Sequence, residues 1–262
     1  MDINLYILAV VQGVSELLPI SSSGHLIIFS EILKVEATVA LLTLLHIATL
    51  GGIVVGYWPE LMKIIKNSFR WRVLLNIVIS CIPAVMLGIL IGEILDEYFY
   101  NLPFVAAMLI LWGVALIVTE RLHDRRPVQK FNDISELRAI DALVIGLFQT
   151  LALLPGTSRS GVMTLAGVWR GMRKDIALEY AFIVGIPIIA GSFFFTVATD
   201  FEDFKPFLNM NGFVTVALAF VVSLLAVLLL KYVSKKKFLT FFGWYRIALG
   251  ALLIGYLLIT QL

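Results

Sequence analysis

Charged residues are scarce in this chain, and this scarcity indicates whether the protein is soluble or embedded in a membrane. Of the 262 residues, 15% are charged and 60% are hydrophobic, whereas a soluble domain has about 25% charged residues and about half apolar ones. The composition therefore argues against an ordinary soluble domain and predicts an integral membrane protein. The formal net charge of +2 is too small to indicate a nucleic-acid partner.

Cysteine is scarce, and no removable leader is expected. The single cysteine, Cys81, lies inside an apolar run, which excludes an intrachain disulfide and favours a small buried side chain. The chain starts Met-Asp-Ile-Asn, without the basic region or the small-residue cleavage site typical of a secretory signal peptide. We therefore expect the first apolar segment to belong to the mature protein.

Most of the apolar residues fall into stretches long enough to cross a membrane as helices, which takes about 20 residues each. The six predicted spans are residues 39–57, 73–91, 103–119, 177–198, 213–230 and 242–259. Two further apolar regions, about 3–33 and 140–170, are interrupted by breaks rich in Pro, Ser and Gly. Because irregular backbone is tolerated at membrane depth only where protein or a water-filled cavity satisfies it, both regions are predicted to be re-entrant helical hairpins.

The distribution of charge agrees with this topology. With both hairpins entering and leaving on one side, most of the 20 Lys and Arg residues fall in loops on the same face of the membrane. Several Asp and Glu residues, including Glu93 and Asp200, fall on the opposite face. The positive-inside rule then predicts that the basic loops are cytoplasmic and that both termini lie outside.

The two breaks are similar to each other, which indicates an internal repeat. VVQGVSELLPISSSG aligns with LFQTLALLPGTSRSG, and three spans follow each copy. Three is odd, so the second copy is inverted and the breaks meet near the midplane, as in many transporters. The predicted fold is a single all-α membrane domain, 1–262, with six transmembrane helices and two re-entrant hairpins in an inverted repeat. Its halves are residues 1–121 and 139–262, joined by a basic cytoplasmic linker, 122–138.

Each break has the composition of an anion site. Ser and Thr are strong N-caps, so a half-helix is predicted to start after each break, with free N–H groups and a positive dipole end aimed inward. Such ends bind phosphate, and Arg159 adds a guanidinium suited to bidentate phosphate contact. Alternatively, Arg159 forms an ion pair with Glu16 that only holds the two hairpins together. Gly24 and Gly161 either permit close backbone approach or simply pack helices.

Polar side chains of the first break suggest two further roles. Gln12 and Glu16 share a helical face, and their oxygens suit Mg²⁺ or Ca²⁺, the hard cations that accompany phosphates; alternatively, Glu16 caps neighbouring serine hydroxyls. His25 follows Ser22 by three residues, a spacing that can pair a nucleophile with its base. A purely structural hydrogen bond is the other interpretation of His25.

These residues carry a family resemblance. QGVSELLPISSSGHL resembles the first signature of the undecaprenyl-diphosphate phosphatase (bacitracin-resistance) family, and PGTSRSG resembles the second. The likeness runs nearly the full length, including FGWYRIALG near the end. It implies an integral membrane enzyme that removes the terminal phosphate of undecaprenyl diphosphate and so regenerates the lipid carrier for envelope glycan synthesis. The resemblance also implies that the site opens to the outer side.

The resemblance also implies roles for individual residues. Ser22 matches the proposed nucleophile, His25 the catalytic histidine and Arg159 the pyrophosphate-binding arginine. Glu16 and Gln12 match the positions that handle the metal or the pyrophosphate. Many members carry Glu in place of Gln12, so metal binding here depends more on Glu16 and the substrate phosphates. The remaining residues expected to line the site are Ser21, Ser23, Thr157, Ser158 and Ser160.

The expected partners are a polyprenyl diphosphate substrate, membrane lipids and a divalent cation, with no nucleic acid; monomer and homodimer both stay open. A rival hypothesis is a polyprenyl-phosphate flippase or a small-anion transporter, which the inverted repeat fits equally well. The grouping of Ser22, His25 and Glu16 favours chemistry, because a carrier needs no nucleophile and base. His46 and Gln149 either face the site or make packing hydrogen bonds, and the packing role is the expected one.

Overall fold

The computed structural model describes residues 3–66, 68, 70–125, 130–234 and 237–260. Within these ranges the chain is built from helices and connecting loops, and its only β-type pairing is an isolated bridge between Phe131 and Met172. The predicted all-α class is therefore confirmed.

Six helices are long and apolar enough to cross a membrane. They are α3 (Val39–Gly56), α5 (Arg70–Phe99), α6 (Leu102–Arg125), α9 (Lys174–Thr199), α10 (Met210–Val233) and α11 (Phe238–Thr260). All six predicted spans are confirmed as helices. Five of them extend beyond the predicted ends, because the helices continue into polar flanking residues that the hydropathy pattern leaves out.

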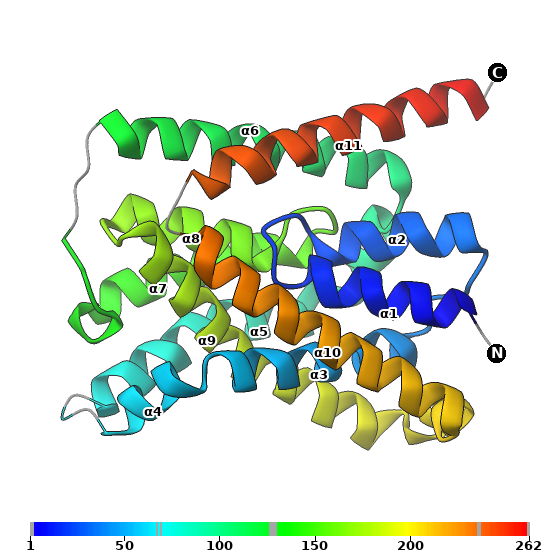
Figure 1. Cartoon of the computed structure of the whole chain (residues 1–262), viewed down its shortest axis with the longest axis horizontal. Helices are drawn as coiled ribbons and strands as arrows, with labels where there is room; N and C mark the ends of the chain where they lie inside the picture. The colour runs from blue at the N-terminus through cyan, green and yellow to red at the C-terminus, as the bar shows by residue number, and fades with distance from the viewer. Residues whose placement is uncertain (1–2, 67, 69, 126–129, 235–236, 261–262) are drawn as a thin grey trace.

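Each of the two interrupted regions folds as a pair of shorter helices. The first pair is α1 (Ile3–Ser15) and α2 (Ser22–Leu33). The second is α7 (Ala139–Gln149), extended by η2 (Thr150–Leu153), and α8 (Arg159–Arg170). The two helices of each pair pack against each other, and Figure 1 shows the first pair nearer the chain termini and the second nearer the opposite end. The remaining elements are α4 (Trp58–Lys66), η1 (Ile134–Glu136) and η3 (Phe201–Phe207).

The packing interleaves the two halves of the chain. Helix α1 packs against α10, and α7 packs against α5, so each short pair rests on a long helix of the other half. The largest interface joins α6 to α11, and α3 contacts both α9 and α10. This arrangement encloses both breaks in the centre of the bundle.

Several ion pairs lie at the end of the bundle that holds α4, which Figure 1 shows opposite the chain termini. Ion pairs tie neighbouring elements together there: Lys231 to Glu60 at 2.9 Å, Lys174 to Glu120 at 2.7 Å and Arg170 to Asp141 at 2.5 Å. The amphipathic α4 lies at this end and was not predicted, because its apolar run is too short for a span. Residues 126–129 of the predicted linker, and Lys235 and Lys236, lie outside the described residues.

The contact between α5 and α7 depends on a glycine. A Cβ atom at Gly146 would lie 2.6 Å from the carbonyl oxygen of Ser80, and close helix packing in membranes needs such small residues. We expect Gly146→Leu to destabilise the protein by roughly 1–3 kcal/mol and to lower the Tm in detergent by about 5 °C. The matched control is Gly255→Leu, because a Cβ there meets no atom within 4 Å. An unchanged Tm for Gly146→Leu would contradict the interface.

Candidate active site

The second helix of each short pair starts in the same way. Ser21 before α2 has φ 75°, and Ser158 before α8 has φ 76°. Each serine Oγ accepts a hydrogen bond from the N–H three residues later, at 3.3 Å in both cases. The predicted serine caps are therefore confirmed. Positive φ is rare outside glycine and costs roughly 1–3 kcal/mol where it is strained, which is typical of functional sites.

Because α2 and α8 start in the same way, their first residues occupy equivalent positions but carry different side chains. The first helical residue is Ser22 in α2 and Arg159 in α8. Both project from a helix N-terminus whose dipole and free N–H groups favour an anion. The two N-termini thus offer a hydroxyl from one side and a guanidinium from the other.

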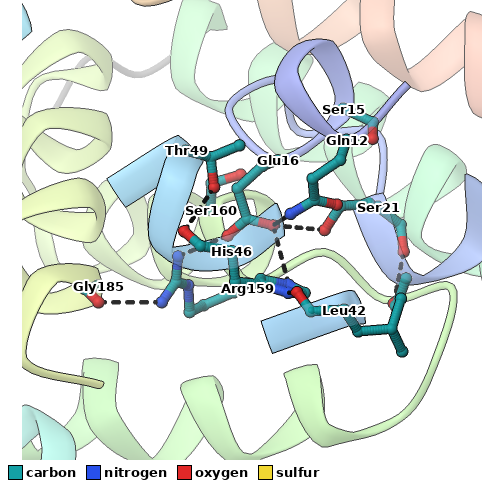
Figure 2. Close-up of polar contacts among 12 residues, drawn as sticks. Gln12, Ser15, Glu16, Ser21, Leu42, His46, Thr49, Arg159, Ser160 and Gly185 are labelled. Atoms are coloured by element: carbon teal, nitrogen blue, oxygen red, sulfur yellow. Dashed lines mark hydrogen bonds and ion pairs between the residues drawn. The ribbon is translucent and has the colours of Figure 1, made fainter. Parts of the chain in front are cut away.

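Glu16, in the turn after α1, joins these two residues. Arg159 Nη2 donates to Glu16 Oε1 at 2.8 Å, and Ser22 Oγ donates to Glu16 Oε2 at 2.5 Å. The same Oε2 lies 3.4 Å from Gln12 Nε2 and 3.5 Å from His46 Nε2. Figure 2 shows the Glu16 carboxylate among Gln12, His46 and Arg159. The alternatives left open for Glu16 and Arg159, ion pair and hydroxyl cap, both occur here, within a polar cluster that adjoins a cavity.

A cavity of about 580 Å³ contains this cluster. Five of the predicted site residues line it: Glu16, Ser22, Ser23, Ser158 and Arg159. Other parts of its wall are apolar and include Leu42, Ile189 and Phe193. The cavity also reaches Ala37, in the loop between α2 and α3, and Tyr100, in the loop between α5 and α6. A polar floor with apolar walls suits a ligand that has an anionic head and a hydrocarbon tail.

Other predicted site residues are buried beside the cavity and do not line it. Gln12, Ser21, Thr157 and Ser160 are at most 3% exposed. Ser160 Oγ lies 3.3 Å from Ser158 Oγ, so it belongs to the α8 cap. Ser21 Oγ pairs in the same way with Ser23 Oγ. These residues shape the two helix starts.

The two glycines of the breaks differ in what surrounds them. A Cβ atom on Gly24 would lie 3.3 Å from the Cα of Gly156, in the other break. On Gly161 it would lie 3.2 Å from Ser158 Oγ. Gly24 therefore agrees with the close-approach interpretation, whereas the neighbours of Gly161 are side-chain atoms of Ser158 and Pro19.

His25 is engaged away from the Ser22 hydroxyl. Its Nδ1 lies 2.7 Å from the Ser21 carbonyl oxygen, which can only accept, so Nδ1 carries the proton. Its Nε2 then accepts from the Tyr245 hydroxyl at 2.8 Å, and the two rings are stacked. Among the described contacts, the hydrogen bond of Ser22 goes to Glu16. The three-residue spacing does not fix the direction of the ring, and the catalytic role of His25 stays a prediction.

Arg246 is a central residue that the sequence analysis left unassigned. It is fully buried at 0% exposure in α11. Its Nη1 donates to the carbonyl oxygens of Pro19 and Thr157 at 3.1 and 3.0 Å, and its Nη2 donates to those of Gly156 at 2.5 Å and Met108 at 3.5 Å. One guanidinium therefore holds both breaks. The signal in the sequence is a lone arginine in an apolar span, which is expensive unless it has internal partners.

His46 and Gln149 make the expected packing hydrogen bonds and also line the cavity. His46 Nδ1 lies 2.7 Å from the Leu42 carbonyl oxygen, and Gln149 Nε2 donates to that of Ser80 at 2.9 Å. The Oε1 atom of Gln149 is buried without a hydrogen-bond partner among the described residues. Both side chains therefore add polar groups to the wall facing the helix starts.

Comparisons with known proteins agree with this geometry. The family model described as bacitracin resistance protein BacA matches residues 5–252. An undecaprenyl-diphosphatase of Thermosipho africanus is 35% identical over 259 residues, which cover 96% of this chain and 100% of the relative. Those of Enterococcus faecalis and Lactococcus lactis subsp. cremoris are 35% and 36% identical, with at least 95% of both chains covered in each case. The chain therefore belongs to the bacitracin resistance protein BacA family.

Proposed function

We propose that this protein hydrolyses undecaprenyl diphosphate to the monophosphate and inorganic phosphate. One observation carries the proposal: the Ser22 hydroxyl is hydrogen-bonded to a carboxylate oxygen of Glu16, whose other oxygen binds Arg159, in a cavity that has apolar walls. A nucleophile beside a base and a cation is the arrangement expected for phosphoryl transfer. The names of the relatives point to the same substrate.

Substrate binding follows from the cavity. The diphosphate enters between the starts of α2 and α8, where two helix dipoles and the Arg159 guanidinium stabilise its charge. The prenyl tail lies along apolar residues such as Leu42, Ile189 and Phe193. Because catalysis of this type is mostly positioning and charge stabilisation, the geometry of the two helix starts accounts for most of the activity.

In the proposed chemical step, Ser22 Oγ attacks the terminal phosphorus. Its proton passes to Glu16, whose Oε2 already accepts that hydrogen bond. The bond from the terminal phosphorus to the bridging oxygen breaks, and the lipid monophosphate leaves with its new charge near Arg159. Water then attacks the phosphoserine and the bond from phosphorus to Ser22 Oγ breaks. Glu16 returns its proton to Ser22 Oγ, and the phosphate leaves as dihydrogen phosphate with both protons of the water. His25 supports the start of α2 through its bonds to Ser21 and Tyr245.

A divalent cation, Mg²⁺ or Ca²⁺, is part of the proposal. The Oε1 atom of Gln12 is buried and has no hydrogen-bond partner among the described residues, so an amide oxygen is available beside Glu16. These two residues would hold the cation. No group of three or more His, Cys, Asp or Glu side chains is placed to hold a metal within the described residues, so the substrate phosphates would supply further ligands. When bound, the cation neutralises charge on the phosphoryl oxygens.

We also propose that the two short helix pairs are re-entrant hairpins of an inverted repeat, with halves 1–121 and 139–262. The matched caps at Ser21 and Ser158 support a repeat, as does the reciprocal packing of α1 on α10 and α7 on α5. The basic loops would face the cytoplasm, and both termini and the cavity would face outward across the plasma membrane. In that location the enzyme would recycle the lipid carrier of envelope glycans and confer bacitracin resistance.

Phosphate release by the purified protein in detergent tests the proposed function. We expect release from a long-chain prenyl diphosphate, stimulated by Mg²⁺ or Ca²⁺ and lost on chelation. Ser22→Ala should lower kcat by about 1000-fold or more, because it removes the nucleophile. The matched control is Ser135→Ala, at a partly exposed serine that is bonded to Asp133 and lies outside the cavity.

Different outcomes separate the alternatives. Phosphate trapped covalently on Ser22 would support the nucleophile, whereas near-normal turnover by Ser22→Ala would mean that water attacks directly. If folded wild-type protein releases no phosphate, the phosphatase proposal fails. The rival flippase would then be tested by lipid transfer across liposomes.

A further inference from the structure

The cavity contains an imidazole for which the proposed reaction has no role. Of the three histidines in the chain, His46 lines the cavity, whereas His25 is buried against Tyr245 and His123 lies near the end of α6. We propose that His46 binds the substrate diphosphate directly, as a contact beside Ser22 and Arg159. This inference rests on the proposed function and assigns a further substrate-binding residue to its site.

The backbone of α3 fixes the direction of the His46 ring. Its Nδ1 lies 2.7 Å from the carbonyl oxygen of Leu42, one turn earlier. A carbonyl oxygen only accepts, so Nδ1 donates the proton of that bond. This bond holds the ring with Nε2 toward the Glu16 cluster (Figure 2).

Nε2 keeps unused hydrogen-bonding capacity, because it can accept from a protonated phosphate in the neutral ring and can donate to a phosphate oxygen when the ring carries both protons. It lies 3.5 Å from Glu16 Oε2, which is longer than the roughly 2.7–2.9 Å of a charge-assisted hydrogen bond. The His46 side chain is 33% exposed, and its exposed part faces the cavity. Nε2 is therefore at the cavity wall, with only a long contact to Glu16, where a ligand oxygen could reach it.

The position of Nε2 identifies the part of the ligand that it meets. Glu16 Oε2, the oxygen nearest to Nε2, also accepts the hydrogen bond of Ser22 Oγ at 2.5 Å. A phosphoryl group attacked by Ser22 therefore lies beside His46. Arg159 faces the same carboxylate from α8, so the phosphate would meet groups from α2, α3 and α8 together. This triangle of groups suits the several oxygens of a diphosphate.

The side chain needs only to form a hydrogen bond, so glutamine should replace it. An amide can donate to a phosphate oxygen or accept from a protonated one, and leucine can do neither. We expect His46→Leu to lower kcat/KM roughly 10- to 100-fold, mainly through KM, the size typical of a hydrogen bond to a charged group. We expect His46→Gln to stay within about 5-fold of wild type, because it keeps that bond. His123→Leu is the control for loss of a histidine outside the cavity.

A binding measurement separates contact from catalysis. Methylenediphosphonate, a diphosphate analogue that resists hydrolysis, should bind to wild type and His46→Gln with similar Kd. It should bind His46→Leu roughly 10- to 100-fold more weakly. Thermal unfolding of each variant without ligand reports its folding separately.

Three results would overturn the inference. One is a folded His46→Leu variant with wild-type KM and wild-type affinity for methylenediphosphonate. Another is equal loss of affinity in His46→Gln and His46→Leu, and the third is a lowered Tm that accounts for the whole effect; either would make His46 structural. Failure of the phosphatase proposal is distinguishable, since wild-type protein would then release no phosphate while the diphosphonate affinities still report on His46.

Discussion

Replacing Arg159 by methionine should lower kcat/KM by about 10³-fold or more, the range found when an arginine that stabilises a phosphoryl transition state is lost. Arg159 is the cationic side chain at the start of α8, and its guanidinium bonds Glu16 Oε1 at 2.8 Å and the Gly185 carbonyl oxygen at 3.3 Å. Its removal takes away the positive charge that would face the phosphates in the proposed complex. Phosphate release by purified variants in detergent measures the effect, and Arg173→Met, at a half-exposed ion pair with Asp175, is the matched control.

A double variant distinguishes a catalytic role of Arg159 and Glu16 from a purely structural ion pair. Arg159→Met alone leaves the buried Glu16 carboxylate without its partner, which destabilises a protein by about 3–5 kcal/mol. Combining it with Glu16→Gln removes both charges and should recover most of the lost Tm. Activity should stay as low as in the single variant, because both groups act on the substrate. Recovery of activity together with stability would show that the ion pair only holds the two breaks together.

Replacing Arg246 by methionine should cause the largest loss of stability of any single change considered. The substitution removes every hydrogen bond from the guanidinium to the carbonyl oxygens of Pro19, Gly156 and Thr157. Each buried carbonyl left without a partner costs about 1–3 kcal/mol, so we expect the Tm to fall by about 10 °C or more. Activity should also fall about 100-fold, because a displacement of about 1 Å at reacting groups has that effect.

Tyr245→Phe provides a graded comparison at the neighbouring position. It removes only the hydroxyl that donates to His25 Nε2, so the Tm should fall by a few degrees, as expected for about 1 kcal/mol. Arg246→Lys keeps a charge but cannot reach several carbonyls in the planar geometry of a guanidinium, and it should resemble Arg246→Met. A wild-type Tm for Arg246→Met would show that the two breaks hold their positions without it.

Much of the fold could be predicted because it depends on length, apolar content and breaks. The six spans follow from long hydrophobic runs, and the shorter paired helices follow from the Pro, Ser and Gly that interrupt the two remaining runs. Helix α4 could not be predicted in this way. Its nine residues, with Glu60, Lys63 and Lys66 among them, are neither long nor uniformly apolar, and it forms where they pack at the end of α3.

In the candidate site, too, features that depend on local sequence could be predicted, whereas features that depend on tertiary contacts could not. The caps at Ser21 and Ser158 are local features, so their residue types predict them. The direction of the His25 ring depends on Tyr245, which lies 220 residues away in the chain, and helical spacing carries no information about such a partner. His46 and Arg246 likewise gain their partners from tertiary packing. A lone arginine in an apolar span indicates that internal partners exist, but it does not indicate which ones.

The bonds of Arg246 limit how the protein can move. A carrier that exposes its site first to one side of the membrane and then to the other usually rocks one repeat against its partner. Here such rocking would pull Pro19 and Thr157 apart while both share one nitrogen of a buried guanidinium. Any movement of one break against the other would therefore have to break bonds of Arg246, whereas the helices around the breaks can shift without breaking them.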